Sequence, residues 1–219
     1  YSLKNAIDDR VLCKYFYHPI TVALSPKEQE EWDNISNKIS KLYAITHGDN
    51  TEDTNKHIAQ LLIERSRIIK NAKNKISTAV NIVTSNYKDG QKWIVYCDNQ
   101  NQLQEVLKLL NASGIRSYEY HSELSNEARE ETLKYFDSVG GVVVSIKCLD
   151  EGIDIPATSH ALILASSQNP REFIQRRGRI LRRSKDKHFA YLYDAIVIPL
   201  DFNQSDKHCR IIESELNRA

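Results

Sequence analysis

Positive charge and potential phosphate ligands are concentrated in Gln175–Ser184, which reads QRRGRILRRS and is called the arginine stretch below. From Arg171 to Lys187 there are eight basic residues and two acidic ones, whereas the 219-residue chain has a formal net charge of only +1. A guanidinium group is always charged and can meet two phosphate oxygens with two parallel N–H donors. The stretch therefore predicts a surface that faces a polyanion, with a solvated basic helix face as the alternative.

A helix is expected to carry these arginines. Asn169 is a suitable N-cap, Pro170 a suitable first residue, and Glu172 completes a capping box. Apolar side chains at helical spacing bury one face, while polar ones at i, i+4 and i+7 share another: Gln175, Arg179 and Arg182. A glycine inside a helix costs about 1 kcal/mol relative to alanine. Gly178 is thus a candidate for the end of the helix. A helix that ends there would place Arg182 in the following loop.

Strands and helices alternate from Lys92 onward, which predicts the frame that holds this helix. The expected strands are 93–97, 115–120, 141–146, 160–165 and 189–197. Repeated β-α units predict an α/β fold with a parallel sheet, right-handed crossovers and helices on both faces. Ligands of such sheets bind beyond the carboxyl ends of the strands, and we expect the candidate residues there.

The front third is expected to be mostly helical. Tyr15–Leu24 is a strand, placed at a sheet edge because Pro19 cannot donate a ladder hydrogen bond. Ser25, Pro26 and Glu28 begin a helix to Ile45, His47–Asp53 is a connection, and 54–72 and 73–85 are helical. We divide the chain into a lead-in at 1–90, an α/β domain at 91–200 and a helical tail at 201–219.

Two strand ends carry further polar groups. After the strand 141–146 the chain reads KCLDEGIDIP, in which Gly152 permits close approach of a ligand and Asp154 can accept from a ribose hydroxyl. Asp98 and Asn99 stand at a helix start, where free amides attract phosphate. A plain turn and simple helix capping are the respective alternatives.

SIKCLDEGIDIP at Ser145–Pro156, together with QRRGRILR, resembles motifs V and VI of superfamily 2 helicases and translocases. The resemblance implies the second, C-terminal RecA-like motor domain. CLDEGIDIP and NPREFIQRRGRILR are similar to the branch shared by restriction-enzyme motor subunits and DNA-repair translocases. The implied fold is a RecA-like parallel sheet with helices on both faces, preceded by the mostly helical segment.

The resemblance also implies the nucleotide-site residues. Arg179 and Arg182 match arginine fingers, which accelerate phosphoryl transfer by roughly 10³ to 10⁵. Gln175 matches the residue near the γ-phosphate and the attacking water. Gly152 and Asp154 match positions that contact the nucleotide. Glu151 is assigned to the same site, with positioning of the arginines as its alternative, and Arg176 to a phosphate contact or a salt bridge.

Five residues are assigned to the nucleic-acid backbone: Asp98, Asn99, His121, Ser145 and Lys147. His121 matches a motif that tracks the backbone in the family. The family commonly has threonine before an acidic residue where this chain has Ile146 and Lys147. Ser145 or Lys147 would have to replace that contact.

The cofactors implied are ATP and Mg²⁺. The chain has no GxxxxGK[ST] phosphate loop and no DExx box, so both would be held mainly by an N-terminal RecA-like domain that these residues lack. The chain alone is therefore predicted to be inactive. No metal site of its own is expected, because Cys13, Cys97, Cys148 and Cys209 lack zinc-ligand spacing.

The expected partner is DNA, with the N-terminal domain and subunits of a restriction, defence or repair system. RNA is the less favoured track, because the DEAD-box form of motif VI begins with histidine. A non-catalytic nucleic-acid-binding module is a further alternative, and a Rossmann-type enzyme ranks last because GxGxxG is missing after Cys97. No membrane span or secretory signal is found, and a cytoplasmic location is expected.

Overall fold

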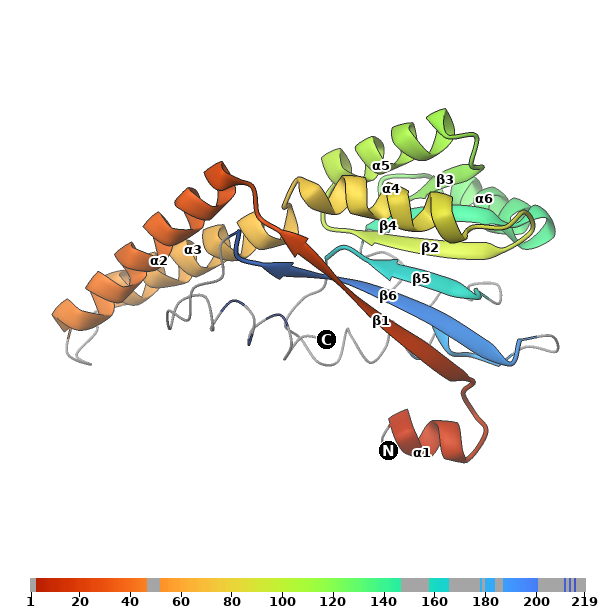
Figure 1. The fold of residues 1–219 in the computed structure, drawn as a ribbon, viewed down its shortest axis with the longest axis horizontal. Helices are drawn as coiled ribbons and strands as arrows, with labels where there is room; N and C mark the ends of the chain where they lie inside the picture. Colours follow the sequence, from red (N-terminus) through yellow and green to blue (C-terminus); the bar gives the residue numbers. More distant parts are fainter. Residues whose placement is uncertain are drawn as a thin grey trace. The chain divides into compact units, whose positions relative to one another are not determined.

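The computed structural model describes residues 3–46, 52–146, 158–165, 178, 180–183, 187–200, 211, 213 and 215. Six helices and six strands are assigned in these ranges (Figure 1). The helices are α1 (Leu3–Asp8), α2 (Pro26–Thr46), α3 (Glu52–Lys70), α4 (Asn74–Asn86), α5 (Gln100–Ala112) and α6 (Asn126–Val139). The strands are β1 (Lys14–Ala23), β2 (Lys92–Cys97), β3 (Ser117–Tyr120), β4 (Gly141–Ile146), β5 (His160–Ile163) and β6 (Phe189–Ile198).

All six strands form one sheet in the order β1-β6-β5-β2-β4-β3. The pairs β3–β4, β4–β2, β2–β5 and β5–β6 are parallel, with Trp93 opposite Val142 and His160. β1 runs in the same direction as β6, since Phe16 stacks on Tyr191 and His18 on Tyr193. The predicted parallel α/β sheet and the edge position of β1 are therefore confirmed.

The sheet is buried on both faces, as a parallel sheet requires. One face contributes Ile94, Val143 and Ile163 to a core that also holds Phe136 of α6 and Ile180 and Leu181 of the arginine stretch. Side chains alternate along a strand, so Trp93, Val142 and Val144 point to the other face, and they too are fully buried. Figure 1 shows α4 and α5 over one side of the strands, and α5 packs against β2, β3 and β4.

Helix starts follow the predicted capping chemistry. The Ser25 N–H and hydroxyl donate to Glu28 Oε2 at 2.9 and 2.7 Å, and the Glu28 N–H returns a bond to Ser25 Oγ at 3.4 Å. Ser125 caps α6 through the Ala128 N–H. The predicted Ser25 cap is confirmed, and Ser125 acts in the same way, because a serine oxygen satisfies an amide that has no partner within the helix.

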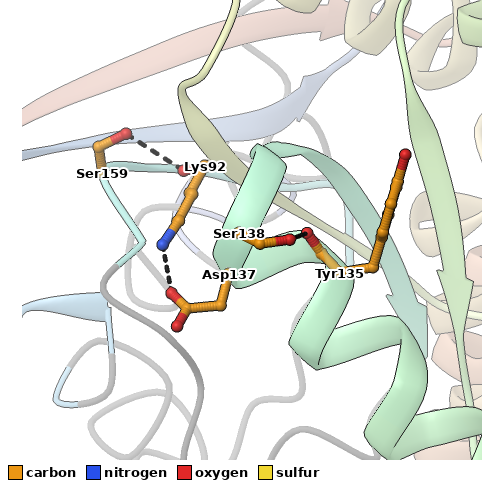
Figure 2. A network of polar contacts seen from close by, with 5 residues as sticks. All are labelled: Lys92, Tyr135, Asp137, Ser138 and Ser159. Atoms are coloured by element: carbon orange, nitrogen blue, oxygen red, sulfur yellow. Dashed lines mark hydrogen bonds and ion pairs between the residues drawn. The ribbon is translucent and has the colours of Figure 1, made fainter.

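Polar contacts fasten the amino ends of the strands (Figure 2). Lys92, the first residue of β2, pairs with Asp137 in the last turns of α6. The Ser159 hydroxyl, just before β5, donates to the Lys92 carbonyl at 3.2 Å, and the Ser138 hydroxyl donates to the Tyr135 carbonyl at 2.9 Å. These contacts tie α6 and β5 to β2 at the edge opposite the expected ligand site.

The chain divides into two compact units that interleave along the sequence: Tyr1–Ile20, Lys75–Ala195 and Arg218–Ala219 in one, and Thr21–Asn74 with Ile196–Asn217 in the other. The second has its own core of Leu24, Trp32, Ala72, Val197 and Ile211. Arg65 lies over the Trp32 ring at 5.4 Å within it. The three-part division at 1–90, 91–200 and 201–219 stays a prediction.

Two details differ from the sequence-based expectation. α1 was not predicted, because its six residues are too few for a clear apolar period. Burial of a lysine in the predicted helix 73–85 was not foreseen, yet Lys75 is only 1% exposed, and its Nζ donates to the Leu164 carbonyl at 2.6 Å. Within the described residues, no helix has the length and hydropathy needed to cross a membrane.

Candidate functional site

The predicted site residues are described only in part. Five lie in the described ranges: Asp98, Asn99, His121, Ser145 and Arg182. Seven lie outside the described residues: Lys147, Glu151, Gly152, Asp154, Gln175, Arg176 and Arg179. The roles of those seven stay predictions.

Asp98 and Asn99 lie between the carboxyl end of β2 and the start of α5. The Asn99 side chain caps the helix by accepting from the Gln102 N–H at 3.0 Å. The Gln102 side chain in turn accepts from the Asp98 N–H at 2.9 Å. This reciprocal pair of bonds is similar to a capping box. Capping thus engages the Asn99 oxygen in this structure, and a phosphate contact at this helix start stays a prediction.

His121 follows the carboxyl end of β3 and belongs to a polar cluster on the same edge of the sheet. Its Nε2 lies 3.5 Å from both Glu119 Oε2 and Gln100 Nε2, and Gln104 donates to Glu119 at 2.7 Å. The His121 side chain is 9% exposed and its Nδ1 has no protein partner among the described residues. Sequence reasoning missed Gln100, Gln104 and Glu119, because nothing in their local pattern beyond polarity marks them as a cluster.

Ser145 is fully buried within β4. It stands between Tyr96 of β2 and Tyr120 of β3 in the strand register. No surface of Ser145 is open to a ligand in this structure, so the predicted nucleic-acid contact would require its neighbours to move. Lys147, the alternative for that contact, lies outside the described residues.

The structure describes Gly178 and Ile180–Arg183 of the arginine stretch. Gly178 and Ile180 are helical, Leu181 forms a turn, and Arg182 makes an antiparallel bridge with Leu12. Gly178 therefore does not end the helix, but Arg182 lies beyond it, in the following segment. The predicted burial of Ile180 and Leu181 is confirmed at 2% and 0% exposure, while the Arg182 side chain is exposed.

Arg182 is not at the carboxyl edge of the sheet, contrary to expectation. Its partner Leu12 precedes Lys14, the first residue of β1. A helix that connects parallel strands must return from the carboxyl end of β5 to the amino end of β6. The last residues of the arginine stretch are consequently displaced from Asp98 and His121.

Residues outside the predicted set hold this segment in place. Lys187 Nζ donates to the carbonyls of Ile180 and Arg182, the latter at 3.2 Å. The Cys13 backbone N–H donates to the Leu181 carbonyl at 2.8 Å. The Arg183 guanidinium group donates to the Arg10 carbonyl at 3.0 Å. Sequence reasoning missed Lys187 because a buried lysine and a surface lysine look alike in a basic run.

A parallel sheet covered by helices, with an arginine-rich crossover before its last strand, is the architecture of a RecA-like motor domain. The helicase conserved C-terminal domain matches residues 74–184, about half of the chain, and the protein belongs to that family within superfamily 2. The match includes the described part of the sheet from β2 to β5 and the whole arginine stretch.

Relatives and solved structures agree with this assignment. The chain is 26% identical to UvrABC system protein B of Thermosipho africanus over 86% of its residues, and 27% identical to the DNA 3'-5' translocase XPB2 of Sulfurisphaera tokodaii over 81%. It spans only 29% and 42% of their lengths. The SWI2/SNF2 ATPase core of Sulfolobus solfataricus in complex with dsDNA has the same fold, with 13% identity and a TM-score of 0.61 over 84% of this chain and 41% of that one.

Proposed function

We propose that this chain is the C-terminal motor domain of an ATP-dependent DNA translocase or helicase. ATP and Mg²⁺ lie between it and an N-terminal RecA-like domain, which holds most of both ligands. ATP supplies the free energy for stepping, and opening and closing of the cleft moves the protein along the nucleic acid.

The nucleotide site uses side chains of the arginine stretch and of the segment after β4. Arg179 and Arg182 neutralise charge that develops on the γ-phosphate, and Gln175 orients the attacking water. Gly152, Asp154, Glu151 and Arg176 contact or position the nucleotide. The observation that carries this proposal is the family match across the whole arginine stretch, together with an Arg182 whose backbone is anchored and whose guanidinium group is exposed.

DNA is the nucleic acid that we favour as the partner. The arginine stretch begins with Gln175 where DEAD-box helicases have histidine, and a DNA translocase matches most of the chain. RNA helicases are also among the relatives: a DEAD-box RNA helicase matches 51% of the chain and a putative ATP-dependent RNA helicase matches 73%, against 81% for the translocase. RNA is accordingly the alternative polymer in the experiment.

The test is ATP hydrolysis by the full-length protein with single-stranded DNA, duplex DNA or RNA. Arg182→Ala and Arg179→Ala should each lower the stimulated kcat by roughly 10³-fold, because a fixed positive charge is lost from the transition state. Arg116→Ala, an exposed arginine before β3, is the matched control and should retain the rate. Absent hydrolysis would favour the non-catalytic binding module, and hydrolysis unchanged in both variants would show that Arg179 and Arg182 are not arginine fingers.

A further inference from the structure

Three consecutive carbonyl groups at the end of the arginine stretch each have a donor from elsewhere in the chain. The carbonyls of Ile180 and Arg182 accept from the Lys187 ammonium group, and that of Leu181 accepts from the Cys13 N–H. The last carbonyls of a helix have no partner within it and are usually left to water or a capping residue. Here the bonds to all three carbonyls come from Lys187 and Cys13. They restrict the main-chain motion that the end of a helix normally keeps.

Lys187 is buried where it makes these two bonds, with 8% of its surface exposed. Burial lowers the pKa of its ammonium group, and the nearby Cys13 thiol partly opposes that shift. A buried ammonium is costly unless hydrogen bonds compensate for lost hydration. The two carbonyl bonds provide that compensation, and the negative end of the helix dipole lies at the same place.

The segment Arg10–Cys13 contacts the arginine stretch from the other side. Besides the bond from Cys13, Leu12 forms the bridge with Arg182, and an Arg183 N–H reaches the Arg10 carbonyl. The segment is itself held by the end of α1, since the Val11 and Leu12 amides both donate to the Ala6 carbonyl. Arg10 has a φ of 61°, which a non-glycine residue adopts only where its surroundings enforce it.

We propose that Lys187 and Arg10–Cys13 form a brace that positions Arg182, and through it the arginine stretch, for ATP hydrolysis. The brace is made of the Lys187 ammonium group and the main chain of residues 10–13. Lys187 is a positioning residue that contacts no substrate. The inference rests on the proposed function, because the arginines are catalytic only in a nucleotide hydrolase.

The brace has a mechanical consequence. Under the proposed function, the N-terminal motor domain precedes α1 in the chain. The main chain that leads away from that domain is thus bonded through the Cys13 N–H to the carbonyl of Leu181, the residue before Arg182. A rotation of the N-terminal domain can reach the arginine through these bonds as well as through the nucleotide.

The decisive variant is Lys187→Met in the full-length protein, which keeps the apolar stem and removes the ammonium group. We expect the stimulated kcat to fall roughly tenfold or more, while the KM for ATP changes by less than about threefold. A displaced arginine stabilises the transition state less but leaves the binding of ATP in the ground state almost unchanged. Lys92→Met is the matched control, because it removes a lysine contact to Asp137 of α6 and leaves the contacts of the arginine stretch in place.

A double variant separates positioning from general weakening. If Lys187 acts through Arg182, Lys187→Met should add almost nothing to the loss already caused by Arg182→Ala. Multiplicative losses, or a kcat like that of Lys92→Met, would overturn the proposal. Should Lys187→Met fail to fold, Arg183→Ala replaces it, because it removes the bond from the exposed Arg183 side chain to the Arg10 carbonyl. An unchanged kcat in Arg183→Ala would then overturn the brace.

Hydrogen exchange gives a readout that needs no hydrolysis. The Cys13 amide, bonded to Leu181, should exchange roughly tenfold faster in Lys187→Met, while the amides of β2 keep their protection. Equal protection of Cys13 in both proteins would show that no brace exists. Absent hydrolysis in the wild-type protein, with faster Cys13 exchange in the variant, would instead reject the proposed function and leave the brace intact.

Discussion

His160 lies in a row of stacked rings on one face of the sheet. Its ring centroid is 4.3 Å from that of Trp93 and 4.8 Å from that of Tyr191, and Ser159 Oγ is 2.7 Å from its Nδ1. The residue is 7% exposed, and burial lowers its pKa from 6.5 to about 4. The folded protein therefore binds this proton only at a lower pH than the unfolded chain does.

We predict that the protein loses stability as the pH falls from about 6.5 towards 4. The unfolded chain takes up a proton on His160 in this window and the folded one does not, so unfolding is favoured by about 2 kcal/mol at pH 5 relative to pH 7. Denaturant unfolding of the wild type and of His160→Phe at both pH values measures this. His57→Phe, at an exposed position, is the control. An identical pH dependence in wild type and His160→Phe would contradict the prediction.

At the scale of single elements, the end of α6 shows how a helix is stopped so that a buried strand can begin. Gly140 has a φ of 78°, and its N–H donates to the Phe136 carbonyl. A Cβ there would lie 2.6 Å from the Gly90 carbonyl oxygen and 2.8 Å from that of Gln91. Both contacts are with backbone, which cannot move aside without disturbing the start of β2.

Gly140→Ala is expected to destabilise the protein by more than 2 kcal/mol, from a strained φ plus a steric clash. Gly114→Ala makes a matched comparison, since Gly114 has a φ of 75° but open space where its Cβ would stand. That variant should lose only about 1 kcal/mol. The difference between their unfolding free energies reports the clash together with the strain of the Gly140 ψ of −162°. Equal losses would show that the backbone near Gly90 yields readily.

At the scale of the whole molecule, the proposed activity is shared between this chain and a second motor domain. The chain has the arginines that we propose for the γ-phosphate but no phosphate loop. We predict that the 219 residues alone hydrolyse no ATP with any nucleic acid, whereas the full-length protein does. Steady-state assays on both, with Arg182→Ala as background, test this. Turnover by the 219-residue chain above that background would contradict a divided site.

The sequence alone was enough to predict the strands β1 to β6, helices α2 to α6 to within a few residues, and the family. Apolar runs and capping residues act over neighbouring positions, so they can be recognised without a partner. The same holds for the arginine stretch, whose residue types and spacing carry the resemblance. Strand order and the burial of individual polar groups do not follow from such local patterns.

Tertiary structure alone decided that Ser145 is buried, that Arg182 leaves the carboxyl edge, and that Lys75 and Lys187 turn inward to main-chain carbonyls. The brace depends on residues far apart in sequence, with Arg183 bonded to Arg10 across 173 positions. Lysine in a basic run carries the same charge whether it faces water or a carbonyl group. Which of the two it meets is settled by the packing of the whole chain, because only that packing determines where hydration is lost and which donor replaces it.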